Sequence, residues 1–516
     1  MKQKFTNLLV LMLCVLGCNT AIAQVSGTVF QDFNGNGILD AGELGLPGVQ
    51  VKAYNAADVQ VASVISASNG SYNLGAPSAN IAMRIEFLVP SDLSCTVSYG
   101  PTVNGINSAT SVQFYPAAAA TTANFGIFDK FKFRSVNNPD PTMVLTRAHL
   151  EDGTPGIDTR NVIVNMNYKK SGDGPESYYN SPLNQVGALW AVAFNRTRNQ
   201  IFTAALFKRH TRLGIGGTGG IYITDPLANT TSLFTTIPNA GANQHEVGNL
   251  FFDRRNTAGV PNVSGVNNPT AAAGTSALGG MDISEDDKTI YVVNLNDKLI
   301  YQVDAFTGLV SATTIAIPAT PGTPAEIASG VARPWALKIY KGKMYVGVVR
   351  DASVSGNFND LKAFVFEYNL CSASWNTTPI LNINLNYQRG AVGNSNGQAY
   401  PNDQTRIWHP WITNWIGNNP PVAQDNDALN GGNGVGNYPE DKFIYPQPIL
   451  TDIEFDDANA MVLAFADRVG FQGKREANDE NGNDPGGANP FTNAGAGNLD
   501  LFSGGDVLRV SQCLGS

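Results

Sequence analysis

A twelve-residue stretch near the start of the chain carries oxygen-bearing side chains at the spacing that a calcium ion requires. Asp and Asn stand at positions 1, 3, 5 and 9, Glu at position 12, a glycine at position 6, and a backbone carbonyl is available at position 7. Calcium takes six to eight oxygen ligands, the glycine permits the sharp turn, and the final glutamate can bind through both oxygens. We therefore predict a calcium site with these ligands: Asp32, Asn34, Asn36, Ile38, Asp40 and Glu43.

The charge of this loop predicts a modest affinity and a structural role. Three of the predicted ligands are charged, namely Asp32, Asp40 and Glu43, and the two Asn side chains are neutral. Such a set suits the range of about 10⁻⁴–10⁻³ M found in extracellular modules. A loop closed around the ion by protein oxygens leaves little room for a reacting water, so we expect no catalysis there. The alternative interpretation is a polar turn that is merely rich in Asn and Gly.

The sequence on both sides of the loop indicates strands rather than helices. SGTVFQD precedes it, and GLPGVQVKAY follows it with an alternation of Val49, Val51 and Ala53. Further short apolar or alternating runs are VQVASVIS, GSYNLG, MRIEFLVP, CTVSYG, SVQFYP and ANFGIF. Short strands separated by turn signals predict an antiparallel β-sandwich of about 100 residues.

The residues around the loop resemble the B-type domain of serine–aspartate-repeat surface adhesins, which is related to the collagen-adhesin B-type fold. The matching pattern is Gly27-Thr-Val-Phe-x-Asp-x-Asn-x-Asn-Gly37, followed by Asp40-x-Gly-Glu-x-Gly-Leu-x-Gly-Val-x-Val51. This resemblance covers roughly residues 25 to 127. It implies an immunoglobulin-like or prealbumin-like spacer stabilised by calcium, with the ligands matched position by position. Family members usually carry several such domains after the binding region, whereas here one stands first.

The remainder of the chain repeats a pattern of strand, tight polar turn and strand. The segments begin at Ala191, Met281, Ala336 and Thr451. A later strand-like run closes each unit, which suits the blade of a β-propeller. The uneven spacing requires long insertions, and residues 386–447 and 472–500 are rich in Asn, Gly, Pro and Asp. Because four blades are few for a ring, residues 130–180 supply another blade or the ring is incomplete; an irregular array of sandwiches is the rival architecture.

The first of these insertions holds a cluster of aromatic residues in RIWHPWITNW. Exposed rings there would stack on sugars or anchor a protein partner, whereas buried rings would form the small core that a long insertion needs. The core interpretation is the favoured one, yet this cluster is also the best candidate for a ligand surface in the sequence. Its candidate residues are Arg406, Trp408, Trp411 and Trp415.

Other motifs in the sequence do not support catalysis. Gly214-x-Gly216-x-x-Gly219 spells a dinucleotide fingerprint, but the run IYITD that follows it predicts a strand instead of the required helix. His245-Glu246 lacks the second histidine of a zinc-protease motif, and the four histidines show no ligand spacing. No Gly-x-Ser-x-Gly elbow occurs. We therefore expect no enzyme and no cofactor other than calcium.

A second Asn- and Asp-rich stretch, NDENGNDPGG, begins like another calcium loop. Asp484 stands where the glycine belongs and Pro490 where the glutamate belongs. We interpret it as a solvated insertion, with a weak surface cation site as the alternative.

Residues 1–23 read as an export signal, with two lysines, the apolar run LLVLMLCVL and a small-x-small cleavage site before Gln24. Val15-Leu-Gly-Cys18 offers a rival route, lipoprotein anchoring through Cys18. Cleavage at Ala23 leaves Cys95, Cys371 and Cys513. An odd number cannot pair fully, and an oxidising compartment would allow a bridge between the last two, with Cys95 left as a buried apolar residue.

Composition excludes some partners. The chain has 33 basic and 42 acidic residues, a formal charge of −9, which disfavours nucleic acid as the main partner. Later segments are too short in apolar residues to span a bilayer. The domains expected are the signal peptide (1–23), a B-type sandwich (24–128) and a propeller-like domain (129–516).

These features together predict an all-β protein that is secreted from, or attached to, a bacterial cell. The sandwich would be a calcium-stabilised spacer, and the propeller-like domain would bind an extracellular protein or glycan. One alternative is a secreted carbohydrate-active enzyme, a polysaccharide lyase or hydrolase housed in the propeller, because propellers host many chemistries. Carboxylates gathered in the propeller centre would favour that enzyme. A structural envelope component without a soluble ligand is the third interpretation.

Overall fold

The computed structural model describes a defined subset of the chain. The described residues are 25–32, 37–41, 43–75, 82–88, 111–116, 121–127, 141–149, 157–172, 177–245, 269–389, 407–412, 441–443, 445–456, 460–472, 499–501 and 505–510. The expected export signal, Cys18, Cys95, Cys513 and the NDENGNDPGG stretch lie outside these ranges. The chain forms two compact units, Met1–Pro139 and Asp140–Ser516. The predicted boundary at 128/129 lies just before residues 129–140, which are outside the described ranges.

The first unit is a β-sandwich. One sheet contains β4 (Ser71–Asn73), β1 (Val25–Gln31), β7 (Thr121–Thr122) and β8 (Phe125–Ile127). The other runs in the order β3 (Gln60–Ile65), β2 (Gln50–Tyr54), β5 (Met83–Leu88) and β6 (Val112–Tyr115). The sandwich is not purely antiparallel as predicted, because β7 and β8 run parallel to β1. The chain arrives at β7 from the opposite sheet, so no hairpin sets its direction relative to β1.

The core of the sandwich follows from the alternation in its strands. Val49, Val51 and Ala53 are fully buried, as their spacing predicts. Phe87 of one sheet stacks on Phe125 of the other with ring centroids 4.5 Å apart. These inward rows form the hydrophobic core of the first unit.

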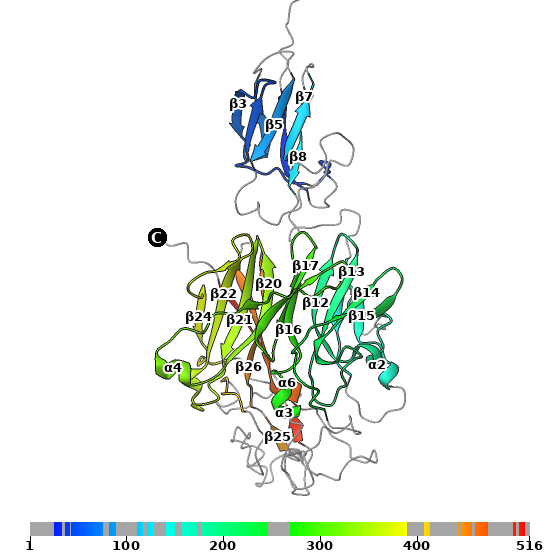
Figure 1. Ribbon diagram of the computed structural model, residues 1–516, viewed down its shortest axis with the longest axis vertical. Helices are drawn as coiled ribbons and strands as arrows, with labels where there is room; N and C mark the ends of the chain where they lie inside the picture. The colour runs from blue at the N-terminus through cyan, green and yellow to red at the C-terminus, as the bar shows by residue number, and fades with distance from the viewer. Residues whose placement is uncertain are drawn as a thin grey trace, which may run out of the picture. The chain divides into compact units, whose positions relative to one another are not determined.

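The second unit is built from sheets whose first strands lie next to one another (Figure 1). In sequence order the sheets are β9 (Thr142–Thr146), β10 (Ile163–Asn167) and β11 (Ser177–Tyr178); β12 (Leu189–Asn195), β13 (Gln200–Ala205), β14 (Gly220–Asp225) and β15 (Thr230–Thr236); β16 (Leu278–Ile283), β17 (Thr289–Asn294), β18 (Leu299–Asp304) and β19 (Ile315–Ala316); β20 (Ala332–Tyr340), β21 (Lys343–Arg350), β22 (Lys362–Asn369), β23 (Ser374–Trp375) and β24 (Leu381–Asn384); and β26 (Pro448–Phe455), β27 (Met461–Asp467) and β29 (Asp506–Val510).

This arrangement is propeller-like. The strands β9, β12, β16, β20 and β26 pack against one another in that order, so each sheet presents its first strand toward the centre. The four predicted repeat units are the first hairpins of four sheets. Residues 141–178 form a further sheet, in the region where the sequence analysis considered an additional blade. Among the described strands, none joins the first sheet to the last by hydrogen bonds to close a ring.

Each predicted repeat unit contains a β-bulge in its first strand. The register shifts between Leu189 and Val192 in β12, and at the corresponding place in β16, β20 and β26. A bulge increases the local twist of the strand. The repetition of this feature is independent evidence that the four hairpins are equivalent.

The turns between the third and fourth strands also repeat. Asp225, Asp304 and Asn369 each use a side-chain oxygen to accept bonds from the backbone nitrogens two and three residues later. Such Asx turns fix a tight reversal locally. The repeated strand ending, as in YITD, YQVD and FEYN, is the sequence signal of this turn.

Helices are short and connect or cap the sheets. They are α2 (Leu183–Val186), α3 (Pro269–Ala272), α4 (Pro324–Ala328) and α6 (Val469–Gln472), with 3₁₀ turns η2 (Ile157–Thr159), η3 (Gly217–Gly219) and η4 (Phe358–Asp360). Phe471 of α6 contacts Trp190 of β12 and Trp335 of β20, with ring centroids 5.2 and 5.7 Å apart. The segment after the last inner hairpin therefore packs back onto earlier sheets through side chains rather than through a strand.

The two long insertions meet each other. β25 (Asp441–Phe443) in the first insertion pairs in parallel with β28 (Leu499–Leu501), which begins in the second. Segments that the sequence shows as separate are therefore joined by backbone hydrogen bonds.

Candidate functional site

The predicted calcium loop begins at the end of β1 with a buried carboxylate. Asp32 is 1% exposed, and its backbone nitrogen donates to the carbonyl of Ile127 on β8 at 3.0 Å. Its Oδ2 accepts a bond from the nitrogen of Gly37 at 2.6 Å. Gly37 has a φ of 73°, which glycine adopts without steric cost. The first predicted ligand, Asp32, is thus hydrogen-bonded to the glycine that forms the sharp turn of the motif.

The far end of the loop is held by a reciprocal turn. Oε2 of Glu43 accepts from the nitrogen of Asp40 at 2.9 Å, and the nitrogen of Glu43 donates to the carbonyl of Asp40 at 3.2 Å. The stem is closed by the nitrogen of Gln31, which donates to the carbonyl of Leu44 at 2.8 Å. The sandwich therefore fixes both ends of the loop.

The donor chemistry fits calcium, but the carboxylates are not gathered into a finished coordination shell. Within the described residues, no three His, Cys, Asp or Glu side chains are close enough together to hold a metal. Asn34 and Asn36, two of the six predicted ligands, lie outside those residues. One carboxylate oxygen of Asp32 accepts a hydrogen bond from the nitrogen of Gly37, and one of Glu43 accepts a hydrogen bond from the nitrogen of Asp40.

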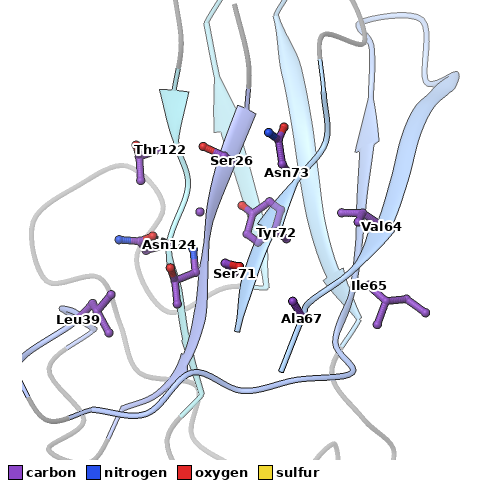
Figure 2. Close-up of a pocket in the computed structure, with 12 residues that line it drawn as sticks. Ser26, Leu39, Val64, Ile65, Ala67, Ser71, Tyr72, Asn73, Thr122 and Asn124 are labelled. Atoms are coloured by element: carbon purple, nitrogen blue, oxygen red, sulfur yellow. Dashed lines mark hydrogen bonds between the residues drawn. The ribbon is translucent and has the colours of Figure 1, made fainter. Parts of the chain in front are cut away.

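An open groove of about 690 Å³ is lined by β1, β4 and β7 of one sheet and by the end of β3 in the other (Figure 2). Its polar lining consists of uncharged side chains, among them Ser26, Ser71, Asn73 and Asn124. Leu39 of the predicted calcium loop also lines it, and Figure 2 shows Leu39 and Ile65 on opposite sides of this lining. Leu39 therefore belongs both to the predicted calcium loop and to the lining of the groove.

Two of the four candidate residues in the aromatic cluster of the first insertion are buried. Trp408 is 0% and Trp411 is 3% exposed, while Arg406 and Trp415 lie outside the described residues. The guanidinium of Arg389 lies 4.0 Å from the ring centroid of Trp408. The favoured interpretation as an insertion core therefore describes the two visible rings, and the ligand-surface interpretation fails for them because other side chains cover their faces.

Trp411 connects the first insertion to the hydrophobic core of the second unit. Arg333 and Arg468 place their guanidinium carbons 5.0 and 4.4 Å from its ring centroid. Its indole nitrogen donates to the carbonyl of Pro448 at 2.8 Å, and its backbone nitrogen donates to that of Asp351 at 2.9 Å. The residue links β20, β26 and the insertion.

The glycine fingerprint is a packing motif. The residues after Gly214 form the 3₁₀ turn η3 and then β14, so the predicted strand is confirmed. A side chain on Gly214 would lie 2.3 Å from the hydroxyl of Tyr222, and this hydroxyl accepts from the nitrogen of Gly216 at 3.1 Å. These glycines allow close approach of the chain to Tyr222 rather than to a phosphate.

Charged side chains gather on the innermost strands, and the sequence analysis did not identify them. Lys338 of β20 lies 2.6 Å from Glu454 of β26 and 3.9 Å from Asp282 of β16. Asp452 lies two residues before Glu454 on β26 and therefore on the same face of that strand. Its pKa is raised to about 6 by burial and by Glu454, with Lys338 opposing the shift. We call these four residues the inner-strand cluster.

Alignment of the repeat units would have revealed this cluster. Asp282, Lys338 and Asp452 each precede a buried isoleucine, in Met-Asp-Ile, Leu-Lys-Ile and Thr-Asp-Ile. Each of these triplets comes directly after the bulge of its strand, or at its end. Equivalent positions on adjacent inner strands are neighbours in space, which is the signal that single-motif searches miss.

Two further observations bear on compartment and membrane. Cys371 follows β22 and is disulfide-bonded. It is the one cysteine among the described residues, so its partner lies elsewhere in the chain. Of the helices in the described ranges, none has the length and apolar character needed to cross a bilayer.

Curated relatives match most of this chain at low identity. Colossin-A of Dictyostelium discoideum is 23% identical over 88% of the chain and 4% of its own length. Colossin-C of the same organism is 22% identical over 87% of the chain and 41% of its own length. The chain therefore spans less than half of either relative.

Solved structures are similar only at a distant level. A luciferin-regenerating enzyme is 10% identical, with a TM-score of 0.29 over 77% of this chain and 82% of that one. An oligogalacturonate lyase in complex with manganese is 10% identical, with a TM-score of 0.26 over 65% and 69%. The β-propeller domain of Myceliophteria thermophila Cps50 (Swd1) is 9% identical, with a TM-score of 0.24 over 64% and 86%. TM-scores this low identify neither a fold nor a function.

The first unit has a specific match. The family model of the SdrD B-like domain matches residues 23–124, the part of the chain that contains the strands β1 to β7 and the Asp32–Glu43 loop, and β8 follows directly after it. This agrees with the resemblance that the loop pattern indicates. The N-terminal part of this chain thus matches the SdrD B-like domain family and folds as a β-sandwich.

Proposed function

We propose that this chain is an extracellular binding protein of the adhesin type, in which a calcium-stabilised SdrD B-like domain is the spacer and the propeller-like unit contacts the ligand. The observation that carries the proposal is the SdrD B-like match, together with the buried Asp32 bonded to Gly37 at the start of an oxygen-rich loop. A bound calcium ion would neutralise Asp32, Asp40 and Glu43 and tie the end of β1 to the chain that follows.

The affinity of such a loop would make the domain responsive to extracellular calcium. A ligand that binds only the folded state at about 100 times its Kd adds about 2.7 kcal/mol of stability. In this proposal calcium is structural, and the ligand of the second unit is a protein or a glycan outside the cell.

The test is calorimetric unfolding of the mature full chain with calcium and with chelator. Calcium should raise the transition of the first unit, and Glu43→Gln should abolish the rise, because it removes the charge of the twelfth position. Glu86→Gln is the matched control, since Glu86 on β5 bonds Arg84 at 2.8 Å and lies outside the loop. All six tryptophans lie in the second unit, so their fluorescence should not respond. An equal calcium response in both variants would refute the calcium site.

A second candidate function is a carbohydrate-active hydrolase or lyase, and the inner-strand cluster is the observation that favours it. A carboxyl group that titrates near the working pH is suited to general acid catalysis, and Asp452 has a pKa of about 6 beside the carboxylates of Asp282 and Glu454. Incubation with polysaccharides, followed by detection of new reducing ends or unsaturated products, distinguishes this candidate. Products that disappear in Asp452→Asn would support it, and their absence across acidic, neutral and uronic substrates would count against it.

A further inference from the structure

The groove of the first unit is built on the side of β1 that faces away from the core. Ser26 and Thr28 alternate along β1 with the buried residues Val25 and Val29. Side chains two positions apart in a strand point to the same face. The two hydroxyl side chains therefore point away from the core, and both line the groove.

The neighbouring strands extend these two positions into rows of hydroxyl and amide side chains. In the register of the sheet, Ser26 lies opposite Asn73 of β4 and opposite Thr122 of β7. Figure 2 shows these three side chains next to one another. Thr28 lies opposite Ser71 of β4 in the second row. All of them line the groove, which therefore has a repeated polar surface.

Several polar groups of these rows are available to a ligand. Oδ1 of Asn124 accepts a bond from the backbone nitrogen of Thr28 at 2.9 Å, which adds Asn124 to the second row. Within the described residues, no hydrogen bond involves the amide nitrogen of Asn124 or the hydroxyl groups of Ser26, Thr28 and Thr122. A hydroxyl can donate one bond and accept two, and an amide nitrogen can donate two. The groove thus offers donors and acceptors that the protein does not use itself.

The residues that line the groove carry no formal charge. A phosphate, sulfate or carboxylate would meet no Lys or Arg in this lining, and an ammonium group would meet no Asp or Glu. Apolar contact is offered by Leu39, which is 39% exposed, and by Ile65, which is 63% exposed. These two side chains stand on opposite sides of the lining (Figure 2). The ligand that fits is neutral, rich in hydroxyl groups and apolar on part of its surface.

The backbone at the edge of the sheet is not open to an added peptide strand. β4 is the terminal strand in its sheet, where an extended peptide would add. The nitrogen of Ser71 in β4 donates to Oδ1 of Asn69 at 3.1 Å, and its carbonyl accepts from the nitrogen of Ala67 at 2.9 Å. Because strand addition depends on main-chain bonds, this edge favours a ligand that bonds to side chains instead.

We propose that the groove of the first unit is a binding site for a neutral carbohydrate. The sugar hydroxyl groups bond to Ser26, Thr28 and Thr122, and the C–H faces of the sugar rings contact Leu39 and Ile65 at the two sides. The affinity is weak, because the groove is open and each hydrogen bond replaces one to water. The first unit is then a binding module as well as a spacer, whatever the second unit contacts.

The experiment is isothermal titration calorimetry of the mature full chain with neutral oligosaccharides: cellohexaose, maltohexaose and mannohexaose. At least one of them should give saturable heat. Hexagalacturonate, which carries a carboxylate on every ring, should bind about tenfold more weakly than the best neutral sugar. Tryptophan fluorescence should not change, because every tryptophan lies in the second unit. No saturable heat with the neutral sugars, or tighter binding of hexagalacturonate, would overturn the proposal.

Variants of β1 assign the heat to the groove. Thr28→Val replaces a hydroxyl by a methyl group of similar shape and should weaken binding about fivefold. Adding Ser26→Ala should weaken it about 20-fold in total. Ser63→Ala is the matched control, because Ser63 on β3 has a surface hydroxyl, bonded to Gln50 at 3.2 Å, that does not line the groove. Wild-type affinity in the double variant would contradict a site in this groove.

An exposed position keeps the test decisive if the β1 variants are less stable than wild type. Ile65→Ala removes apolar contact at one side of the groove without opening a cavity in the core, since the side chain is 63% exposed. It should weaken sugar binding about threefold at unchanged thermal stability. An unchanged affinity would show that this side of the groove does not contact the ligand, against the proposal.

Other occupants of the groove give different results with the same proteins. Sedimentation of the full chain should show a monomer; a dimer that the Ser26→Ala, Thr28→Val double variant dissociates would assign the groove to a second copy of the chain. Saturable heat with an uncharged Ser- and Thr-rich peptide, and none with the sugars, would assign it to an extended peptide. Either result would replace the carbohydrate as the occupant, and neither bears on the ligand of the second unit.

Discussion

Asp287, in the hairpin between β16 and β17, accepts two hydrogen bonds from Thr197, in the hairpin between β12 and β13. The backbone nitrogen of Thr197 lies 3.0 Å and its hydroxyl 2.9 Å from Oδ2 of Asp287. Asn195 adds a bond from its side chain to the carbonyl of Asp287 at 3.0 Å. The propeller-like unit is therefore held together by bonds between neighbouring hairpins as well as by its apolar core.

This relationship predicts the effect of a small substitution. Thr197→Val should lower the free energy of unfolding of the second unit by about 1–2 kcal/mol, because it removes one donor to a buried carboxylate. Thr197→Ser keeps the hydroxyl and should remain within about 0.5 kcal/mol of wild type. Urea titration followed by tryptophan fluorescence measures both. Equal stabilities for Val and wild type would show that the bond between hairpins contributes nothing.

Trp411 allows a direct choice between the core and the ligand-surface interpretations. Trp411→Ala should lower the free energy of unfolding by about 3–5 kcal/mol, because it empties a site between Arg333 and Arg468. Trp411→Phe should cost less, since it loses the bond to Pro448 but keeps a ring. Denaturant unfolding monitored by circular dichroism avoids dependence on the altered fluorophore. A stable Ala variant would contradict the core role.

Cys371 predicts a cross-link that mass spectrometry can locate. If cleavage follows Ala23, the candidate partners are Cys95 and Cys513, and we expect Cys513 because it follows β29, an element of the same unit. Peptide mapping without reduction should recover Cys371 joined to Cys513. Cys371→Ser should lower the stability of the second unit by about 2–5 kcal/mol. A Cys95 linkage would contradict this pairing and would join the two units covalently.

Local patterns explain why part of the fold was predictable. The alternation of Val49, Val51 and Ala53 has the period of a strand with one buried face, and those residues are buried. The hairpins beginning at Ala191 and Met281 were visible because a polar turn between two apolar runs specifies itself locally. The parallel direction of β7 and β8 relative to β1 could not be predicted from the sequence, because parallel pairing depends on where the chain returns in space.

The candidate sites also differ in whether consecutive residues or the packing of the fold brings their side chains together. The Asp32–Glu43 loop could be read directly, since all its ligands lie within twelve consecutive residues. The inner-strand cluster does not lie in any one stretch of sequence, because Asp282 and Asp452 are 170 positions apart on strands that meet only when their sheets pack. Only a comparison of the repeat units would have pointed to it. The surroundings of Trp411 were equally undetermined, since Arg333 and Arg468, which cover its ring, come from segments outside its insertion.

The sequence by itself determined the features that a few consecutive residues specify: the SdrD B-like pattern, the oxygen-rich side chains of the Asp32–Glu43 loop, and the strand hairpins of the second unit. Tertiary structure alone decided which side chains meet, namely Thr197 with Asp287, Lys338 with three acids, and Trp411 between two arginines. The physical reason is that turn geometry and strand periodicity act over a few residues. Burial and electrostatic coupling depend instead on the packing of sheets that are far apart in the chain.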